Sequence, residues 1–317
     1  MELLVAVYSL YVLALIILST TLNLIICYII LSKIKAIEMP HLFILSISIS
    51  DILHTSIGLV SELCVLHGAT SLKKSYTCIG ASFLTYSFTV SNIMQMVMIS
   101  IVRVIALKFP IFYFNNCKKM KFRLGCLFLC YFYGFLWPSF PLLGWSTYEE
   151  DLDKRRCSLD WNLTNSNSFS YLMFAFIFCY IFPAIVLIWS LNVTKKTVDE
   201  QRESSFRKNR PNEQMEILEK VYLKIFLCSA IAYFVIWTPY ACATLLSIFR
   251  IKTPSVVFTF CALFAKSSAI SNALVNCYMN KSFQVHLNEI RVFSCFIKEN
   301  RVAPRITNAS VTEETQA

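Results

Sequence analysis

Long runs of apolar residues, separated by short polar stretches, dominate this chain. Seven of the runs are long enough to cross the hydrocarbon core of a bilayer, which takes about 20 helical residues. Because lipid offers the backbone no hydrogen-bond partners, runs of this kind cross membranes as α-helices. We therefore expect seven membrane-spanning helices, at residues 5–31, 41–66, 76–108, 122–144, 169–193, 217–246 and 254–279.

The composition agrees with a membrane protein. Hydrophobic residues make up 56% of the 317 positions and aromatic residues 15%, which exceeds the apolar fraction of ordinary soluble domains. No internal repeat or low-complexity segment divides the chain. We expect one polytopic domain over residues 1–317, in which an amphipathic helix at 281–296 and a polar tail at 297–317 follow the last span.

The distribution of basic residues predicts the orientation in the membrane. Lysines and arginines are concentrated after the odd-numbered spans and in the tail, whereas acidic residues dilute them in the other connections. The positive-inside rule then places the N-terminus outside the cell and the C-terminus in the cytoplasm of a multi-pass cell-membrane protein. The net charge of +10 fits contact with anionic lipid. No nucleic-acid-binding motif accompanies it.

Most of the 13 cysteines lie inside apolar spans, where a thiol acts as a small hydrophobic group. Cys78 and Cys157 differ, because one lies at the outer start of the third span and the other in the acidic loop before the fifth. Both face an oxidising compartment, so we expect a disulfide between them. Asn162 begins an Asn-Leu-Thr sequon in the same loop, a glycosylation site or a chance match. We expect no metal site.

Lys266 is the most informative residue, because it lies within the apolar seventh span. A lysine at the centre of a membrane helix costs about 2.5–3.5 kcal/mol on insertion scales, and such residues usually serve a function. A buried amine avoids this cost by losing its proton, by pairing with a carboxylate, or by condensing with a carbonyl compound. The last alternative would make Lys266 a covalent anchor.

Several motifs resemble one receptor family. Residues 264–272 (Phe-Ala-Lys-Ser-Ser-Ala-Ile-Ser-Asn) and 280–283 (Asn-Lys-Ser-Phe) resemble the seventh helix of opsins and the start of their eighth. Residues 236–240 (Ile-Trp-Thr-Pro-Tyr) resemble the opsin sixth helix, and residues 141–146 and 157–161 resemble the second extracellular loop. The resemblance covers nearly the whole chain. It implies an all-α, rhodopsin-like seven-helix bundle, that is, a retinal-binding class A G-protein-coupled receptor.

The resemblance also implies that Lys266 binds retinal, as the 11-cis or a related isomer, through a Schiff base. Trp237 and Tyr240 are three residues apart and can form rigid walls of the pocket. Without the lysine, we would interpret such aromatic residues as ordinary bundle core. Four further residues fall at matching pocket positions: Tyr86, Thr89, Phe176 and Ala262.

A protonated Schiff base in an apolar pocket needs a counterion. Ala81 occupies the position at which vertebrate visual pigments carry a glutamate, so another acid must serve. Glu62 lies eleven residues after Asp51, three turns of a regular helix with about 3.6 residues per turn, and should project from the same face. Asp151 matches the loop acid of many invertebrate-type opsins. We prefer Glu62 and keep Asp151 as the alternative; each could also be a solvated surface acid.

The cytoplasmic motifs depart from the receptor pattern. Residues 102–104 read Val-Arg-Val, so Arg103 lacks the usual neighbouring acid, and Glu219 matches the sixth-helix acid that can pair with it. Asn272 is followed by neither the proline nor the tyrosine of the usual seventh-helix motif, while Asp51 is retained. The Val-Arg-Val triplet, the missing vertebrate counterion and the short N-terminus resemble opsins of cnidarians and other early-branching animals. We expect Arg103, Glu219, Asp51 and Asn272 to form the activation switch.

Two functions remain open. The chain is either a light-sensing receptor that activates a heterotrimeric G protein, with stimulatory coupling to cyclic AMP as the preferred subtype, or a retinal photoisomerase or non-coupling retinal-binding opsin. For the receptor, which we favour and which is not an enzyme, arrestin and a receptor kinase are further expected partners.

Overall fold

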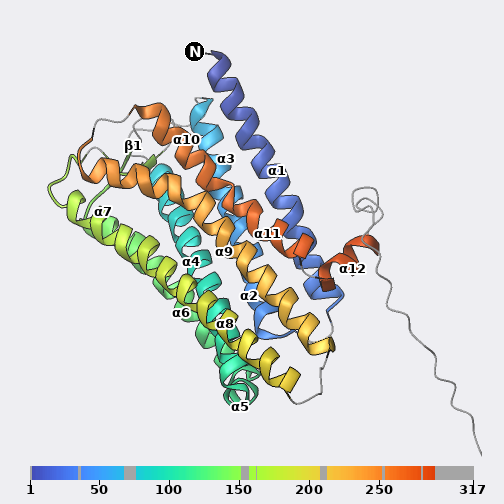
Figure 1. Ribbon diagram of the computed structural model, residues 1–317. Coiled ribbons are helices and arrows are strands. Elements are labelled where there is room, and N and C mark those ends of the chain that lie inside the picture. Colours follow the sequence, from blue (N-terminus) through green and yellow to red (C-terminus); the bar gives the residue numbers. More distant parts are fainter. Residues whose placement is uncertain are drawn as a thin grey trace, which may run out of the picture.

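The structure is a computed structural model that describes residues 2–34, 37–67, 76–150, 157–161, 163–207, 213–251, 254–279 and 281–289. Within these ranges, seven helical segments are long and apolar enough to cross a membrane. They pack side by side into one elongated bundle (Figure 1). The predicted seven-helix architecture is therefore confirmed.

Some spans are single helices and others consist of consecutive pieces. The first, third and sixth spans are α1 (Glu2–Ser32), α4 (Tyr76–Lys108) and α9 (Glu213–Ile248). The other four spans are the following: α2 (Met39–His54), the π-helical turn η1 (Thr55–Leu59) and α3 (Val60–Leu66); α6 (Met120–Ser139) and the 3-10 turn η3 (Phe140–Leu143); α7 (Ser168–Phe176), the π-helical turn η4 (Ile177–Ile181) and α8 (Phe182–Arg207); and α10 (Ser255–Lys266) and α11 (Ser268–Met279).

Shorter elements connect the spans. The third and fourth are joined through α5 (Pro110–Phe112) and the π-helical turn η2 (Tyr113–Cys117), which the sequence pattern did not predict. The last helix of the described residues, α12 (Lys281–Glu289), begins where the amphipathic helix was expected. The remainder of the expected 281–296 helix and the tail at 297–317 lie outside the described residues.

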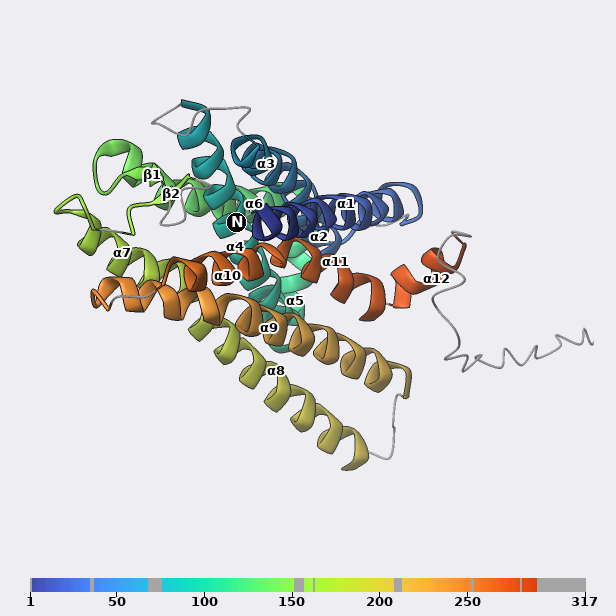
Figure 2. The same ribbon diagram turned by 90° about the horizontal axis from the view of Figure 1, so that it is seen from above.

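Two helices extend well beyond the apolar runs that predicted them. The predicted fifth and sixth spans ended at 193 and began at 217, whereas α8 continues to Arg207 and α9 begins at Glu213. Much of the charge-dense connection is thus helical, because lysine, arginine, glutamate and glutamine are good helix formers. The apolar runs mark only the part of each helix that is suited to lipid. In Figure 2, α8 and α9 diverge towards these charged ends.

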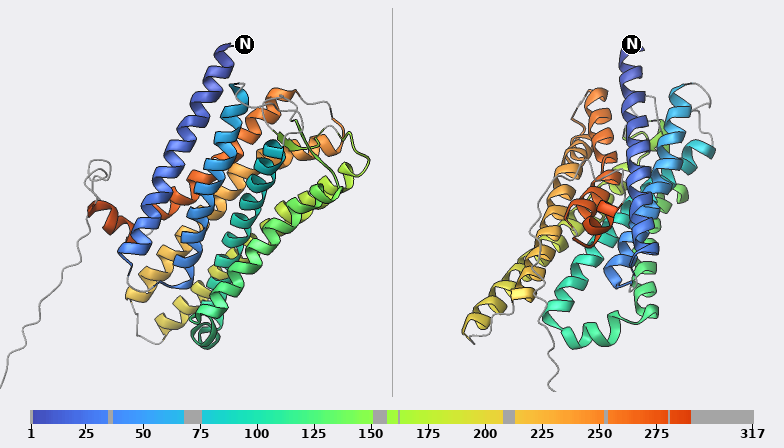
Figure 3. Two further views of the ribbon diagram at one scale, coloured as in Figure 1. Left: turned by 180° about the vertical axis from the view of Figure 1, so that it is seen from behind. Right: turned by 90° about the vertical axis from the view of Figure 1, so that its right-hand side faces the viewer.

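A glycine sets the close packing of α4 against α6. A Cβ atom at Gly134 of α6 would lie 2.6 Å from the backbone nitrogen of Ser91 in α4 and 2.7 Å from its Cα. These separations are shorter than van der Waals contact, so no larger residue fits without moving a helix backbone. Figure 3 shows the two helices running alongside each other.

A small hairpin lies at the end of the bundle that carries the N-terminus (Figure 1). Strands β1 (Tyr148–Glu150) and β2 (Cys157–Leu159) are antiparallel, with Tyr148 opposite Leu159. The buried Tyr148 hydroxyl donates a hydrogen bond to the Pro138 carbonyl, 2.9 Å away. The hairpin is thereby fixed to the fourth span.

The residues after β2 are held by Asp160, which is 1% exposed. Its carboxylate accepts hydrogen bonds from the Thr164 and Asn165 backbone nitrogens at 3.1 and 3.0 Å, and from the Ser168 hydroxyl at 2.7 Å. Burial acts to raise the pKa of Asp160, but these hydrogen bonds outweigh burial and lower it. The ionised aspartate therefore stabilises the loop that leads into α7.

Candidate functional site

Lys266 is the last residue of α10, at a break in the seventh span. The helix stops at Ser267, whose N–H bonds to the Phe264 carbonyl at 3.1 Å, and α11 begins one residue later. The Lys266 side chain is 15% exposed and forms an ion pair with Glu62. The negative charge of Glu62 therefore offsets part of the free-energy cost of placing the positive charge of Lys266 inside a membrane span.

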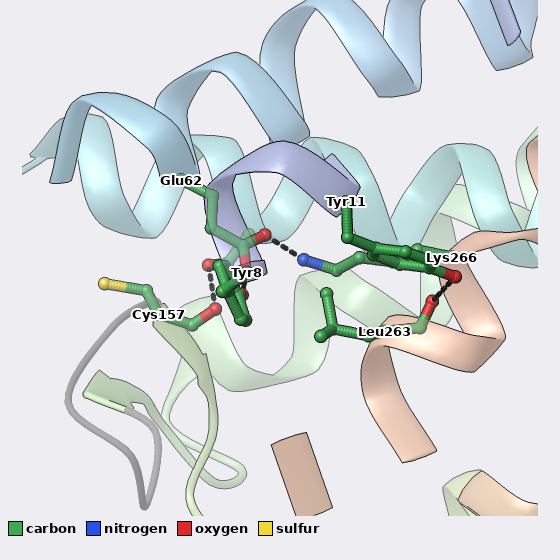
Figure 4. Close-up of polar contacts among 7 residues, drawn as sticks. Tyr8, Tyr11, Glu62, Cys157, Leu263 and Lys266 are labelled. Carbon is green, nitrogen blue, oxygen red and sulfur yellow. Dashed lines mark hydrogen bonds and ion pairs between the residues drawn. The ribbon is translucent and has the colours of Figure 1, made fainter. Parts of the chain in front are cut away.

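Glu62 comes from α3 and is 5% exposed. One carboxylate oxygen contacts the Lys266 amine, and the other accepts a hydrogen bond from the hydroxyl of Tyr8 in α1. Figure 4 shows the carboxylate lying between the two partners. Side chains from three spans thus meet at one buried point.

The second span, which carries Glu62, is not a regular helix. The expectation that Glu62 projects from the same helix face as Asp51 is therefore wrong. The π-helical turn η1 lies between Asp51 and Glu62. One wider turn changes the angular position of every later residue by about 100°, the rotation of one residue in an α-helix. Asp51 accepts a 2.8 Å hydrogen bond from Asn92 of α4, whereas Glu62 points to α1 and α10. The two acids do not share one face, although both point into the bundle.

A cavity of about 240 Å³ adjoins this polar group. The wall of the cavity is mainly apolar and includes Lys266 and Glu62. Except for Asp151, every residue that was predicted from the sequence to line the retinal pocket also belongs to this wall. These are Tyr86, Thr89, Phe176, Trp237, Tyr240 and Ala262. The structure therefore brings five spans together around one space, and the part of each residue in retinal binding stays a prediction.

The cavity walls are rigid aromatic surfaces. The rings of Trp237 and Tyr240 meet edge to face with centroids 6.4 Å apart, and Trp161 from the loop packs edge to face on Tyr240 at 5.7 Å. The Tyr86 hydroxyl donates to the Cys179 sulfur at 3.6 Å. An amine beside a carboxylate, at the edge of an aromatic cavity, fits an elongated apolar aldehyde that becomes cationic once it is attached.

Sequence reasoning missed two residues of this site. Tyr8 gave no signal, because a tyrosine in an apolar helix is common and its partner is distant in sequence. His54 is 4% exposed, lines the cavity, and also lines a second space of about 20 Å³ beside Asp51 and Asn272. Among the residues that the structure describes, its Nε2 has no hydrogen-bond partner. A histidine in a span is a sequence signal that could have identified it.

Other predicted site residues fall partly or wholly outside the described residues. Asp151 and Asn162 are not described, and neither are the side chains of Cys78 and Glu219. Cys157 is disulfide-bonded, and its pairing with Cys78 stays a prediction. The Arg103 guanidinium lies over the ring of Phe226 in α9, 5.7 Å from its centroid.

Comparisons with known proteins agree with this architecture. The model of the family described as 7 transmembrane receptor (rhodopsin family) matches residues 22–280. The chain is 25% identical over 270 residues to the G0-coupled rhodopsin of Mizuhopecten yessoensis and 24% identical over 277 residues to Opsin-3 of Mus musculus. Each alignment covers 83% of this chain, which spans 66% and 65% of the length of these two relatives.

Among solved structures, the crystal structure of squid rhodopsin has the same fold. The TM-score is 0.79 at 20% sequence identity, and the match covers 93% of this chain and 89% of the squid chain. The break after Lys266, the buried acid and the aromatic cavity thus lie within a bundle of known type. This multi-pass membrane protein belongs to the rhodopsin family of seven-transmembrane receptors, and the relatives that it resembles are opsins.

Proposed function

We propose that this chain is a light-sensing receptor that holds retinal covalently on Lys266 through a protonated Schiff base. The observation that carries this proposal is the largely buried Lys266 amine, which adjoins an aromatic cavity of about 240 Å³ and contacts a buried carboxylate. Condensation of the amine with the aldehyde releases one water molecule and leaves an imine, which extends the conjugation of the polyene. Protonation of the imine moves its absorption into the visible range.

Glu62 is the proposed counterion. It already contacts the Lys266 amine, and a protonated imine places its positive charge on the same nitrogen atom. Ala81 lines the cavity but has no charge to offer. The alternative acid, Asp151, lies outside the described residues, so only its loop position supports it.

The proposed output is activation of a heterotrimeric G protein, with stimulatory coupling to cyclic AMP, from a receptor whose C-terminus is cytoplasmic. Trp237 and Tyr240 both belong to α9 and line the cavity. A change in the shape of the bound chromophore therefore acts directly on α9, which also carries Phe226 against Arg103 of α4. This path joins the cavity to the side of the bundle that carries the basic residues.

The test is the absorption spectrum of the purified protein after addition of 11-cis-retinal. Wild-type protein should gain a visible band, and borohydride should trap retinal on the peptide that contains Lys266. Lys266→Ala should abolish both signals, whereas Lys118→Ala, which removes an exposed lysine, should keep them. A Lys266→Ala protein that retains a visible band and covalent retinal would exclude the proposal.

A second measurement separates the receptor from a photoisomerase or non-coupling opsin. Illumination of pigment-bearing cells should raise cyclic AMP above the level in cells that express Lys266→Ala. Light-driven isomerisation without any G-protein response would assign the chain to the alternative function.

A further inference from the structure

We infer that Tyr8 is a positioning residue that keeps Glu62 ionised, so that the group on Lys266 is an ion pair and not a neutral pair. This inference rests on the proposed function, because it assigns a role to a residue beside the proposed counterion. It concerns the first span, in which the sequence placed no residue at the retinal site.

The contacts of Glu62 support this role. Its side chain is buried, and its two carboxylate oxygens face different partners, Lys266 on one side and the Tyr8 hydroxyl on the other. Tyr8 is itself 4% exposed, so bulk water does not compete for its hydroxyl. A buried carboxylate needs such additional hydrogen bonds, because attraction to one cation does not fully offset its desolvation.

The alternative to the ion pair is transfer of one proton from the nitrogen to Glu62. The nitrogen loses a positive charge, the carboxylate gains a proton, and the pair becomes neutral without any change in its total proton number. Apolar surroundings favour this neutral form. A phenol O–H bonds more strongly to a carboxylate than to a neutral acid, so the hydrogen bond from Tyr8 favours the ionised form.

This reasoning predicts a specific optical signature for Tyr8→Phe. With retinal attached, the neutral pair carries an unprotonated imine, which absorbs in the ultraviolet. Removing the hydroxyl should increase the ratio of neutral to ionised pair about tenfold, the scale of one charge-assisted hydrogen bond. Because internal proton transfer binds no proton from solution, the ultraviolet-absorbing fraction should not change across the neutral pH range. If the substitution instead opened the site to water, the imine would exchange its proton with solvent and the ultraviolet-absorbing fraction would depend on pH.

Two variants provide the comparison. Glu62→Gln should give an ultraviolet fraction that does titrate, because the imine then exchanges its proton with solvent alone. Tyr11→Phe removes a hydroxyl from the same helix three residues later, where it donates to the Leu263 carbonyl at 3.4 Å (Figure 4). Tyr11→Phe should therefore leave the spectrum unchanged.

An infrared measurement on the retinal-free protein tests the pair independently of pigment formation. In difference spectra against wild type, Tyr8→Phe should show an added carbonyl stretch of a protonated carboxylic acid, and neither Tyr8→Phe/Glu62→Gln nor Tyr11→Phe should show it. As a rescue, 3-fluorotyrosine at position 8 keeps the ring and supplies a stronger donor, so it should maintain the wild-type ionised pair.

The outcomes separate this inference from the proposed function. A wild-type pigment together with unchanged visible and infrared spectra in Tyr8→Phe would overturn the role of Tyr8 and leave the receptor proposal intact. A Tyr8→Phe ultraviolet fraction that titrates as in Glu62→Gln would also overturn it. Failure of the wild type to bind retinal, with the infrared change present in Tyr8→Phe, would remove the proposed function but support the role of Tyr8.

Discussion

Three side chains from three spans, Tyr8, Glu62 and Lys266, meet beside a cavity whose wall is mainly apolar, and Glu62 and Lys266 belong to that wall. The Glu62 carboxylate is buried and the Lys266 amine is largely buried, so each of these two charges depends on the other for its stability. Changes of single atoms in this group should therefore have effects that are much larger than those of substitutions elsewhere in the wall. The clearest case is the carboxylate.

Glu62→Gln should move the pigment towards an ultraviolet-absorbing form at neutral pH. The negative charge stabilises the protonated imine, so its removal lowers the imine pKa, and each unit corresponds to about 1.36 kcal/mol. Added chloride should partly restore visible absorption by supplying an anion. The measurement is a pH titration of the visible band.

Asp151→Asn is the control for this prediction. If Glu62 is the counterion, this loop substitution should change the pKa of the imine far less than Glu62→Gln does. A large decrease in Asp151→Asn, together with a wild-type pKa in Glu62→Gln, would transfer the role to Asp151.

Some residues of the site could be predicted from the sequence and others could not. Lys266 and Glu62 could be identified because an ionisable side chain in a membrane span is costly and therefore conspicuous. Tyr8 could not, since a tyrosine carries no such cost and its contact with Glu62 arises only when α1 packs beside α3. The contact between Glu62 and Lys266 was expected from charge, but the helix geometry that permits it was not.

At the scale of single elements, the apolar runs located all seven spans because lipid requires long apolar helices. The runs could not reveal the π-helical turns at Thr55–Leu59, Tyr113–Cys117 and Ile177–Ile181, which change hydrogen bonding without changing hydropathy. They also could not locate the charged ends of α8 and α9. Those ends depend on helix propensity and not on burial.

Gly134→Ala should destabilise the protein, because the new methyl group would overlap the Ser91 backbone of α4. Overpacking of this kind costs about 1–3 kcal/mol. Gly125→Ala in the same helix is the control, since a Cβ atom there meets nothing within 4 Å. Thermal unfolding of the purified variants should show a lower midpoint for Gly134→Ala only; equal midpoints would contradict tight packing of α4 on α6.

The loop after β2 should be sensitive to acid through Asp160. Its pKa is lowered in the folded protein, so its stabilising contribution is present above the unfolded value of about 3.9 and is lost as pH falls through the folded value. Unfolding midpoints measured from neutral to acidic pH should decline less in Asp160→Asn than in wild type. Parallel declines would show that Asp160 does not supply this pH dependence.

At the scale of the whole molecule, contacts between α4 and α9 join the cavity to the opposite end of the bundle. Arg103 lies over the Phe226 ring, and its sequence neighbours Val102 and Val104 are both apolar. The cation–ring contact is therefore one identified restraint between these helices. Such contacts contribute about 0.5–2 kcal/mol.

Phe226→Leu should raise the activity of the receptor in the dark. Leucine preserves most of the apolar contact of this buried position but removes the ring face that attracts Arg103. A bias of about 1 kcal/mol corresponds to a several-fold change in the population of an active state. Cyclic AMP in unilluminated cells, at matched expression, is the measurement.

Glu219→Gln provides a second probe of the same restraint, since it should raise dark activity if Glu219 pairs with Arg103. Dark levels that equal wild type in both variants would show that Arg103 does not restrain α9.

The π-helical turn at Thr55–Leu59 has a consequence for how such receptors diverge. Loss of one residue within this turn would restore a regular helix, and the lost residue would offset the change in winding, so α3 would keep its direction. Glu62 would still face α1 and α10. The turn therefore absorbs the gain or loss of a single codon without moving the acid. The number of residues between Asp51 and the buried acid can thus differ among receptors of this fold while the negative charge stays in one place.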